Sequence, residues 1–253
     1  SSSECLDKVN HYCFEGKKVF DSTFRTLVAG GGTGDATIFL AEQLREYNAE
    51  VVHLDLSQAS MTIAQERAKV RGLDNITWLQ SSLLDLPSLE IDKFDFINCS
   101  GVLHHLKNPS QGLAALNSVL KDDGAMSIMV YGKYGRTAIY QMQELMRRMN
   151  GQVDDVEAQL QNCRTILGSL PDSNWYNHSR PVFPDKSCQK SIELYDLFFH
   201  SQDRAYSVPE LYEYVEDESL SLLKFLPVKS EFGNGLYKPE TYIRDAELLD
   251  TVK

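Results

Sequence analysis

The sequence lacks the features that mark a membrane, secreted or nucleic-acid-binding chain. No apolar run approaches the roughly 20 residues that a membrane-spanning helix needs. The five cysteines include no Cys-x-x-Cys pair and no zinc-ligand spacing, which is typical of a reduced, cytoplasmic protein. Basic residues are in deficit, with 25 Lys and Arg against 36 Asp and Glu, so the net charge is −11. These absences predict no membrane partner, no nucleic-acid partner and no metal site, and they leave the oligomeric state open.

The composition is otherwise ordinary for a globular chain. Of the 253 residues, 42% are hydrophobic and 24% are charged, which excludes a disordered or fibrous protein. The length suits one large α/β domain with an added segment.

Short apolar runs alternate with stretches of helical periodicity over much of the first half of the chain. The runs predicted as strands are Thr26–Ala29, Val51–Asp55, Ile76–Leu79, Phe94–Cys99 and Ala125–Val130. A turn is predicted at Lys121–Gly124, before the fifth strand. Strands that alternate with helices in this way predict a doubly wound, mostly parallel sheet. Right-handed crossovers bring the carboxyl ends of its strands, and the ligand, to one edge.

Four segments are predicted along the chain. Residues 1–24 form a helical or irregular N-terminal segment, and residues 25–137 form the α/β core. Residues 138–207 form a helical insertion after the fifth strand, which we expect to cover the carboxyl edge of the sheet. Residues 208–253 return to the core, with a further strand at Leu220–Leu226.

A glycine-rich turn and an acidic residue carry the strongest functional signal. Gly30, Gly32 and Gly34 follow the first predicted strand directly, where the chain must turn sharply and lie against a ligand without a Cβ in the way. Asp55 comes 21 residues after Gly34, at the end of the second strand. A carboxylate at that place can accept both ribose hydroxyls of an adenosine. Together the two features predict a nucleoside ligand.

The residue after the last of these glycines narrows the choice of nucleoside. Asp35 stands where the dinucleotide fingerprint has its third glycine, and a carboxylate at a helix N-terminus disfavours a pyrophosphate there. A ligand with a sulfonium and an amino group tolerates the acid. No Gly-Lys-Ser/Thr follows, which excludes a Walker loop. The residues therefore favour S-adenosylmethionine over NAD.

Five segments, in order, resemble the motifs of class I S-adenosylmethionine-dependent methyltransferases. The matching segments are Leu27–Gly34, Asp55–Ser57, Gln80–Pro87, Phe94–His105 and Leu120–Ala125. They are similar to the glycine-rich motif, the acidic motif, the adenine-contact loop, the fourth motif and the turn before the fifth strand. The resemblance covers residues 24–132. It implies the Rossmann-like, seven-stranded type of sheet, with S-adenosylmethionine as cofactor and S-adenosylhomocysteine as its product.

The resemblance also implies which residues hold the cofactor. They are Ala29, Gly30, Gly31, Gly32, Gly34, Asp55, Leu56, Met61, Ser82, Leu83, Cys99, Ser100 and Val102. Two positions depart from the family pattern. Val28 stands where the family often has an acidic residue, and Ser82 stands where an aspartate often contacts the adenine.

No Ser/His/Asp or Cys/His grouping accompanies these motifs. Methyl transfer from a sulfonium is an in-line displacement in which alignment and exclusion of water matter most. A general base helps only when the acceptor must lose a proton. His105 and Tyr131 are the candidate catalytic residues, and we expect positioning to matter more than either.

Three classes of function stay open for the acceptor. Asn98–Gly101 reads Asn-Cys-Ser-Gly and not the Asn/Asp-Pro-Pro-Tyr/Phe used on exocyclic amino nitrogens, which disfavours adenine, cytosine and glutamine. A small molecule methylated on O, N or C is one class, and a protein side chain, whose basic surroundings would suit the −11 charge, is another. The third is a regulatory module that binds the cofactor without turnover. Residues 138–207 are long enough to enclose a small pocket, which favours the small molecule.

Overall fold

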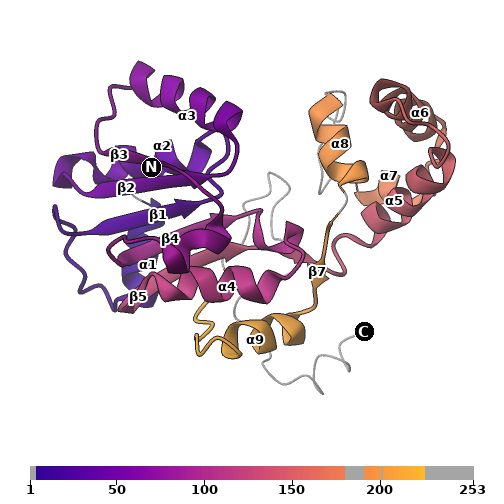
Figure 1. Ribbon diagram of the computed structural model, residues 1–253. Helices are drawn as coiled ribbons and strands as arrows, with labels where there is room; N and C mark the ends of the chain where they lie inside the picture. The colour runs from indigo at the N-terminus through magenta and orange to yellow at the C-terminus, as the bar shows by residue number, and fades with distance from the viewer. Residues whose placement is uncertain (1–3, 180–190, 201, 226–253) are drawn as a thin grey trace. The chain divides into compact units, whose positions relative to one another are not determined.

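The computed structural model describes residues 4–179, 191–200 and 202–225. The chain forms two compact units (Figure 1). The first contains residues 4–130 and 210–224, and the second contains the described part of residues 131–209 together with Phe225. In the part of the chain that is described, no helix combines the length and the apolar character needed to cross a membrane.

A parallel sheet of five strands forms the centre of the first unit. Its strands are β1 (Arg25–Ala29), β2 (Glu50–Asp55), β3 (Ile76–Gln80), β4 (Phe94–Ser100) and β5 (Leu120–Met129). Their order is β3-β2-β1-β4-β5, and every neighbouring pair is parallel. The predicted doubly wound α/β sheet is therefore confirmed. The strand order reverses beside β1, so the loops after β1 and β4 meet at the point where such sheets bind ligands.

Helices cover both faces of this sheet, which is why β1 and β2 are buried along nearly their whole length. On one face α1 (Glu4–Cys13) and α2 (Asp35–Leu44) pack with Val28, Val51 and Phe96. Right-handed crossovers place α4 on the other face, where it packs with the short helix η2. The remaining elements of this unit are η1 (Arg45–Tyr47), α3 (Gln58–Val70), η2 (Leu83–Ser88), η3 (Leu103–His105), α4 (Pro109–Ser118) and, from Glu210 on, α9 (Val208–Glu216).

Two predictions about strands are wrong. Lys121–Gly124 is not a turn but lies inside β5, opposite the point where the register of β4 shifts between Phe94 and Phe96. Residues 220–225 form no strand, and Leu226 lies outside the described residues. A side-chain hydrogen bond holds the chain just before this stretch. Asn117 Nδ2 of α4 donates to the carbonyl of Glu218 at 3.0 Å.

The second unit is mainly helical. It contains β6 (Tyr131–Gly132), α5 (Thr137–Met149), α6 (Val156–Ser169), α7 (Trp175–Ser179), α8 (Ser191–Phe199) and β7 (Ala205–Tyr206). Ile139, Met142 and Met146 on α5 are fully buried against Leu160 of α6 and Phe198 of α8, so this unit has an apolar core of its own. The two short strands pair in parallel although 73 positions separate Gly132 from Ala205.

A buried polar cluster joins α5 to the chain that follows α8. Asp203 accepts from Arg136 Nη2 at 2.9 Å, from the Tyr140 hydroxyl at 3.0 Å and from Gln143 Nε2 at 3.2 Å. The Arg136 guanidinium also lies 3.5 Å from the centre of the Tyr131 ring. The Asp203 carboxylate is therefore paired as it leaves water, which burial of a charge requires.

Candidate functional site

The glycine loop after β1 has a backbone that only glycine adopts easily. The φ angles are +71° at Gly30, +53° at Gly32 and +93° at Gly34, the last of which caps α2. There is also no room for a side chain at two of these positions. A Cβ on Gly30 would lie 2.3 Å from Cγ2 of Val102, and one on Gly34 would lie 2.7 Å from Cβ of Ala64. The loop therefore leaves its backbone open to a ligand at the carboxyl end of β1.

Asp55 joins this loop to the end of β2. Its Oδ2 accepts from the Gly32 amide and its Oδ1 accepts from the Ser57 amide, both at 2.7 Å. Each carboxylate oxygen has a second lone pair, which remains able to accept from a ligand hydroxyl. A fixed carboxylate beside an exposed glycine backbone fits the ribose and the chain of an adenosine derivative, so the residues present suit the predicted cofactor.

Asp35 is paired with Arg67 of α3. Arg67 donates from Nη2 to the Asp35 carboxylate and from Nη1 to the carbonyl of Thr33 at 2.7 Å. The guanidinium offsets the negative charge at the start of α2, and it also ties the glycine loop to α3. The position of Asp35 therefore discriminates less strongly against a pyrophosphate than its charge alone predicts.

The loop after β3 is a short rigid helix. Ser82 caps η2 by accepting from the Leu84 amide at 3.2 Å, and Asp85 accepts from the Ser82 amide at 3.3 Å. This reciprocal pair is a capping box. The Ser82 hydroxyl thus serves the backbone, which gives a physical reason for serine at a position where the related family often has aspartate.

The end of β4 closes the other side of the glycine loop. Cys99 is fully buried, and burial raises the pKa of its thiol to about 12, so it is no nucleophile at neutral pH. Ser100 is exposed at the strand end, and Val102 packs on Gly30. Gly101, at φ +78°, makes the turn between them.

The structure brings most of the predicted cofactor residues to one edge of the sheet. Gly30, Gly31, Gly32 and Gly34 share that edge with Asp55, Leu56, Ser82, Ser100 and Val102. Leu56 is 72% exposed beside Asp55, whereas Ala29, Met61, Leu83 and Cys99 are buried in the unit's interior. Ala29 and Cys99 therefore offer a ligand only their backbone groups.

The two candidate catalytic residues lie in different units. His105 ends η3 in the first unit, and its ring centre lies 4.2 Å from that of the buried His104. Tyr131 begins the second unit, where burial raises the pKa of its phenol in spite of the nearby Arg136. A phenol with a raised pKa stays protonated at neutral pH and is a poor general base.

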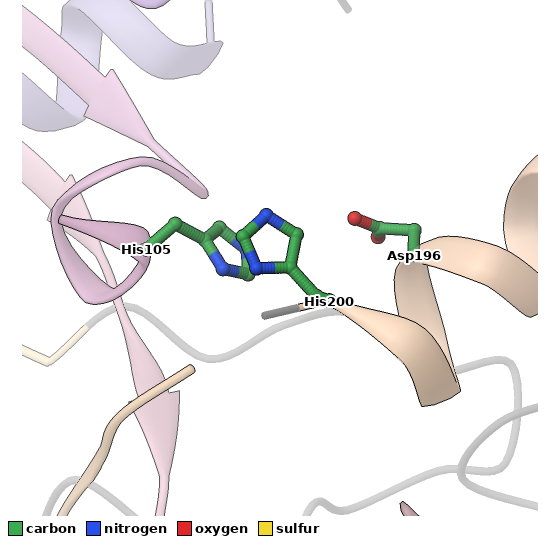
Figure 2. Close-up of side chains that lie close together, drawn as sticks. All are labelled: His105, Asp196 and His200. Carbon is green, nitrogen blue, oxygen red and sulfur yellow. The ribbon is translucent and has the colours of Figure 1, made fainter. Parts of the chain in front are cut away.

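Asp196 lies on α8, and His200 directly follows the end of that helix, four positions later (Figure 2). A carboxylate oxygen of Asp196 and a ring nitrogen of His200 lie within 4.8 Å of one another. His105, drawn in the same figure, belongs to the first unit. Two ligand atoms are fewer than a zinc site uses, so Asp196 and His200 do not by themselves form one.

A surface hollow of about 480 Å³ lies within the second unit. Its lining includes the exposed aromatic rings of Tyr134 and Trp175, together with Thr137 and His178. The hollow is largely open to solvent, unlike the clefts of about 300–1,000 Å³ that bury most of a small molecule. Aromatic walls with a few polar groups suit a partly apolar organic ligand.

Sequence reasoning missed His53. Its ring is fully buried in the middle of β2, with Nδ1 2.8 Å from the Thr37 hydroxyl and the ring centre 4.9 Å from that of Trp78. The available signal was a histidine inside the apolar run Val51–Leu54, two positions before Asp55.

Comparisons with known proteins agree with the site. Residues 27–126 match a family model described as a methyltransferase domain. An uncharacterised protein of Synechococcus sp., syc1184_c, is 36% identical over 203 residues, which cover 79% of this chain and 48% of that protein. The tRNA 5-carboxymethoxyuridine methyltransferase of Escherichia coli is 32% identical over 112 residues, which cover 44% of this chain and 41% of the relative. The chain thus spans about half the length of these relatives or less.

A solved structure extends the likeness beyond the matched domain. PKMT2 from Rickettsia typhi, in complex with AdoHcy, superposes with a TM-score of 0.65. The match covers 84% of this chain and 42% of that one, at 18% sequence identity. At this identity the likeness shows a shared fold.

Proposed function

We propose that this chain, which belongs to the class I S-adenosylmethionine-dependent methyltransferases, transfers a methyl group to an O, N or C atom of a small-molecule acceptor. The observation that carries the proposal is the glycine loop Gly30–Gly34 bonded to the carboxylate of Asp55. That arrangement is rigid, negatively charged at one point and otherwise made of open backbone, which suits a cationic adenosine derivative.

Each of the residues that would hold the cofactor is proposed to contact a different part of it. Asp55 would accept from the ribose hydroxyls, and the glycine loop would lie against the amino-acid portion. Leu56 and the η2 turn that Ser82 begins would flank the adenine. When bound, S-adenosylmethionine would supply a methyl group on a positively charged sulfur, which an acceptor atom displaces in line.

The chain has to align the acceptor and exclude water. We propose that the second unit, including residues 138–207, supplies most acceptor contacts, and the hollow lined by Tyr134 and Trp175 supports this. His105 and Tyr131 are proposed to position the acceptor. The absence of a depressed pKa on Tyr131 supports positioning over base catalysis.

A protein side chain is the second candidate acceptor. The net charge of −11 favours a basic partner segment over a polyanion. Similarity does not decide between acceptors, since the E. coli relative, named for its action on tRNA, aligns with only 44% of this chain. We also propose the cytoplasm as the location, on the grounds that the cysteines form no disulfide-like spacing.

A labelling experiment tests the proposal. The chain is incubated with methyl-labelled S-adenosylmethionine and a cell extract divided into small-molecule, protein and RNA fractions. We expect label in the small-molecule fraction, and none when Asp55→Ala replaces the wild type. Label in the protein or RNA fraction would instead identify that class of acceptor. Binding of S-adenosylhomocysteine without any labelling would indicate a regulatory module.

A further inference from the structure

His53 lies directly beneath the glycine loop. The ring belongs to β2, between Val28 of β1 and Trp78 of β3 in the register of the sheet. It points to the face that α2 covers, where Thr37 contacts Nδ1. Thr37 and His53 are both fully buried, so the ring has little freedom to move.

The space above this ring is what requires glycine at position 31. A Cβ on Gly31 would lie 2.4 Å from both Nδ1 and Cε1 of His53, closer than atoms can approach. Gly31 is not among the glycines with positive φ, unlike Gly30, Gly32 and Gly34. A positive φ is therefore not what requires glycine here, and the three nearest atoms that a Cβ would meet all belong to the imidazole.

The same short stretch of β2 fixes the loop by hydrogen bonds. The amides of Gly30 and Gly31 both donate to the carbonyl of Leu54, at 2.8 and 3.0 Å. The next residue, Asp55, accepts from Gly32. His53 thus sets how closely the loop approaches the strand, while its two neighbours hold the loop there.

We propose that His53 is a positioning residue for the cofactor, which in its neutral form supports the loop at Gly31 and so places the Gly32 amide and the Asp55 carboxylate for binding. The inference rests on the proposed cofactor and adds a residue to its site. It also accounts for a polar ring in the interior of the sheet, where an aliphatic side chain would fill the space at lower cost.

Protonation of His53 would disturb this arrangement. Burial lowers the pKa of the ring, and the Asp55 carboxylate opposes that shift without cancelling it. Among the side chains that contact the ring, Thr37 and Trp78 carry no charge, so Asp55 is the charged group that faces it. Nε2 has no hydrogen-bond partner among the described residues, so the imidazolium, which carries a hydrogen on both nitrogens, would bury one N–H unpaired.

A double-mutant cycle tests the support role. The variants are Gly31→Ala, His53→Ala and their combination, and the measurement is the Kd for S-adenosylhomocysteine by calorimetry. We expect Gly31→Ala to weaken binding by about tenfold or more, because overpacking displaces the loop. Adding His53→Ala should bring the Kd back to within about threefold of His53→Ala alone, because the space is then free.

Matched controls separate this effect from a general loss of folding. Gly168→Ala adds the same methyl group at a helical glycine with no atom within 4 Å, and its Kd should equal that of the wild type. Each variant is also checked by thermal unfolding. Should the double variant with alanine fail to fold, Gly31→Ala with His53→Asn provides the same comparison with a smaller cavity.

The pH dependence of binding gives a readout that packing alone would not move. The wild-type Kd should rise as the pH falls from 7 towards 5, and His53→Asn should lack that part of the rise. Additive effects of Gly31→Ala and His53→Ala on the Kd would overturn the inference about His53. Identical pH profiles for wild type and His53→Asn would also overturn it. Either result would leave the proposed function standing. A wild-type chain that does not bind S-adenosylhomocysteine would overturn the proposed function and this inference with it.

Discussion

Arg136 and Asp203 form an ion pair in which both side chains are almost completely buried. The two groups meet at 2.9 Å, and the exposed fractions of their side chains are 6% and 4%. Tyr140 and Gln143 donate to the same carboxylate, and Gln143 also donates to the carbonyl of Leu197. One carboxylate therefore joins the start of α5 to the end of α8 and to the chain beyond it.

Asp203→Ala should destabilise the second unit strongly. Removal of one partner from a buried ion pair leaves an uncompensated charge and typically costs about 3–5 kcal/mol. The chain has two tryptophans, Trp78 in the first unit and Trp175 in the second. Urea denaturation of a Trp78→Phe background, followed by the fluorescence of Trp175, therefore reports on the second unit.

Glu144→Ala serves as the control for that experiment. Glu144 lies on the same helix and pairs with Arg147 and Arg148, but these side chains are well exposed. Exposed ion pairs contribute little, so the denaturation midpoint should stay where it is in the Trp78→Phe background. Equal effects of the two alanine variants on the denaturation midpoint would show that the buried ion pair stabilises the second unit no more than the exposed pairs do.

Asp55→Ala should weaken the binding of S-adenosylhomocysteine. Two charge-assisted hydrogen bonds to the ligand, together worth roughly 2–4 kcal/mol, correspond to about 30- to 800-fold in Kd. The Gly32 amide also loses its acceptor, which loosens the glycine loop. Calorimetry measures the change, with Asp122→Ala, an exposed acidic residue in β5, as the control. NAD binding by the wild type, with no response to either sulfur nucleoside, would contradict the assignment of the cofactor.

Asp95 gives a prediction about stability and pH. This buried carboxylate receives hydrogen bonds from Lys18 and Lys121, each at 2.7 Å. Burial alone would raise its pKa, but the hydrogen bonds from Lys121 and Lys18 outweigh burial and lower the pKa below its ordinary value. Because the folded-state pKa is the lower one, the stabilisation is complete above the unfolded value of about 3.9 and is lost as the pH falls further.

The test compares wild type with Asp95→Asn in urea between pH 3 and pH 7. The difference in the free energy of unfolding should be constant at neutral pH and should shrink below about pH 4, as Asp95 of the wild type becomes protonated. Asp122→Asn, at the exposed Lys93–Asp122 pair, should show no such dependence. A difference that is the same at every pH would mean that Asp95 titrates alike in the folded and unfolded chains.

His105→Ala should slow turnover by less than the roughly 10²–10⁴-fold that loss of a general base costs. Alignment of the reacting atoms carries most of the rate in a displacement from an activated leaving group. The affinity for S-adenosylhomocysteine should stay unchanged, and His11→Ala, at an exposed residue of α1, should leave both quantities as they are. A larger loss of turnover with intact binding would make His105 the base and point to a hydroxyl or ammonium acceptor.

The features that could be predicted from the sequence are those that depend on residues close together along the chain. The four strands before β5 and the meeting of Asp55 with the glycine loop follow from apolar runs, glycine spacing and the rule that parallel strands end at one edge. The pairing of Arg136 with Asp203 crosses 67 positions and has no local signal. His53 was missed for a related reason, since its partner Gly31 is already explained as part of a turn.

The strand errors have the same origin. Lys121–Gly124 has the composition of a turn, and it lies in β5 between the pairs Phe94–Leu120 and Phe96–Ala125, at the point where the register shifts. A strand can accommodate unpaired residues where its register shifts, and only the three-dimensional pairing of the residues on either side reveals it.

The pairing of β6 with β7 brings together the two ends of the segment 131–206. The chain enters at Tyr131 and leaves at Tyr206, and the Lys133 amide donates to the Tyr206 carbonyl at 2.8 Å. The ends of this segment are thus adjacent, so its length can change without drawing them apart. With the roles proposed above, exchange of this segment would change the acceptor specificity and leave unchanged the residues of the first unit that are proposed to hold the methyl donor.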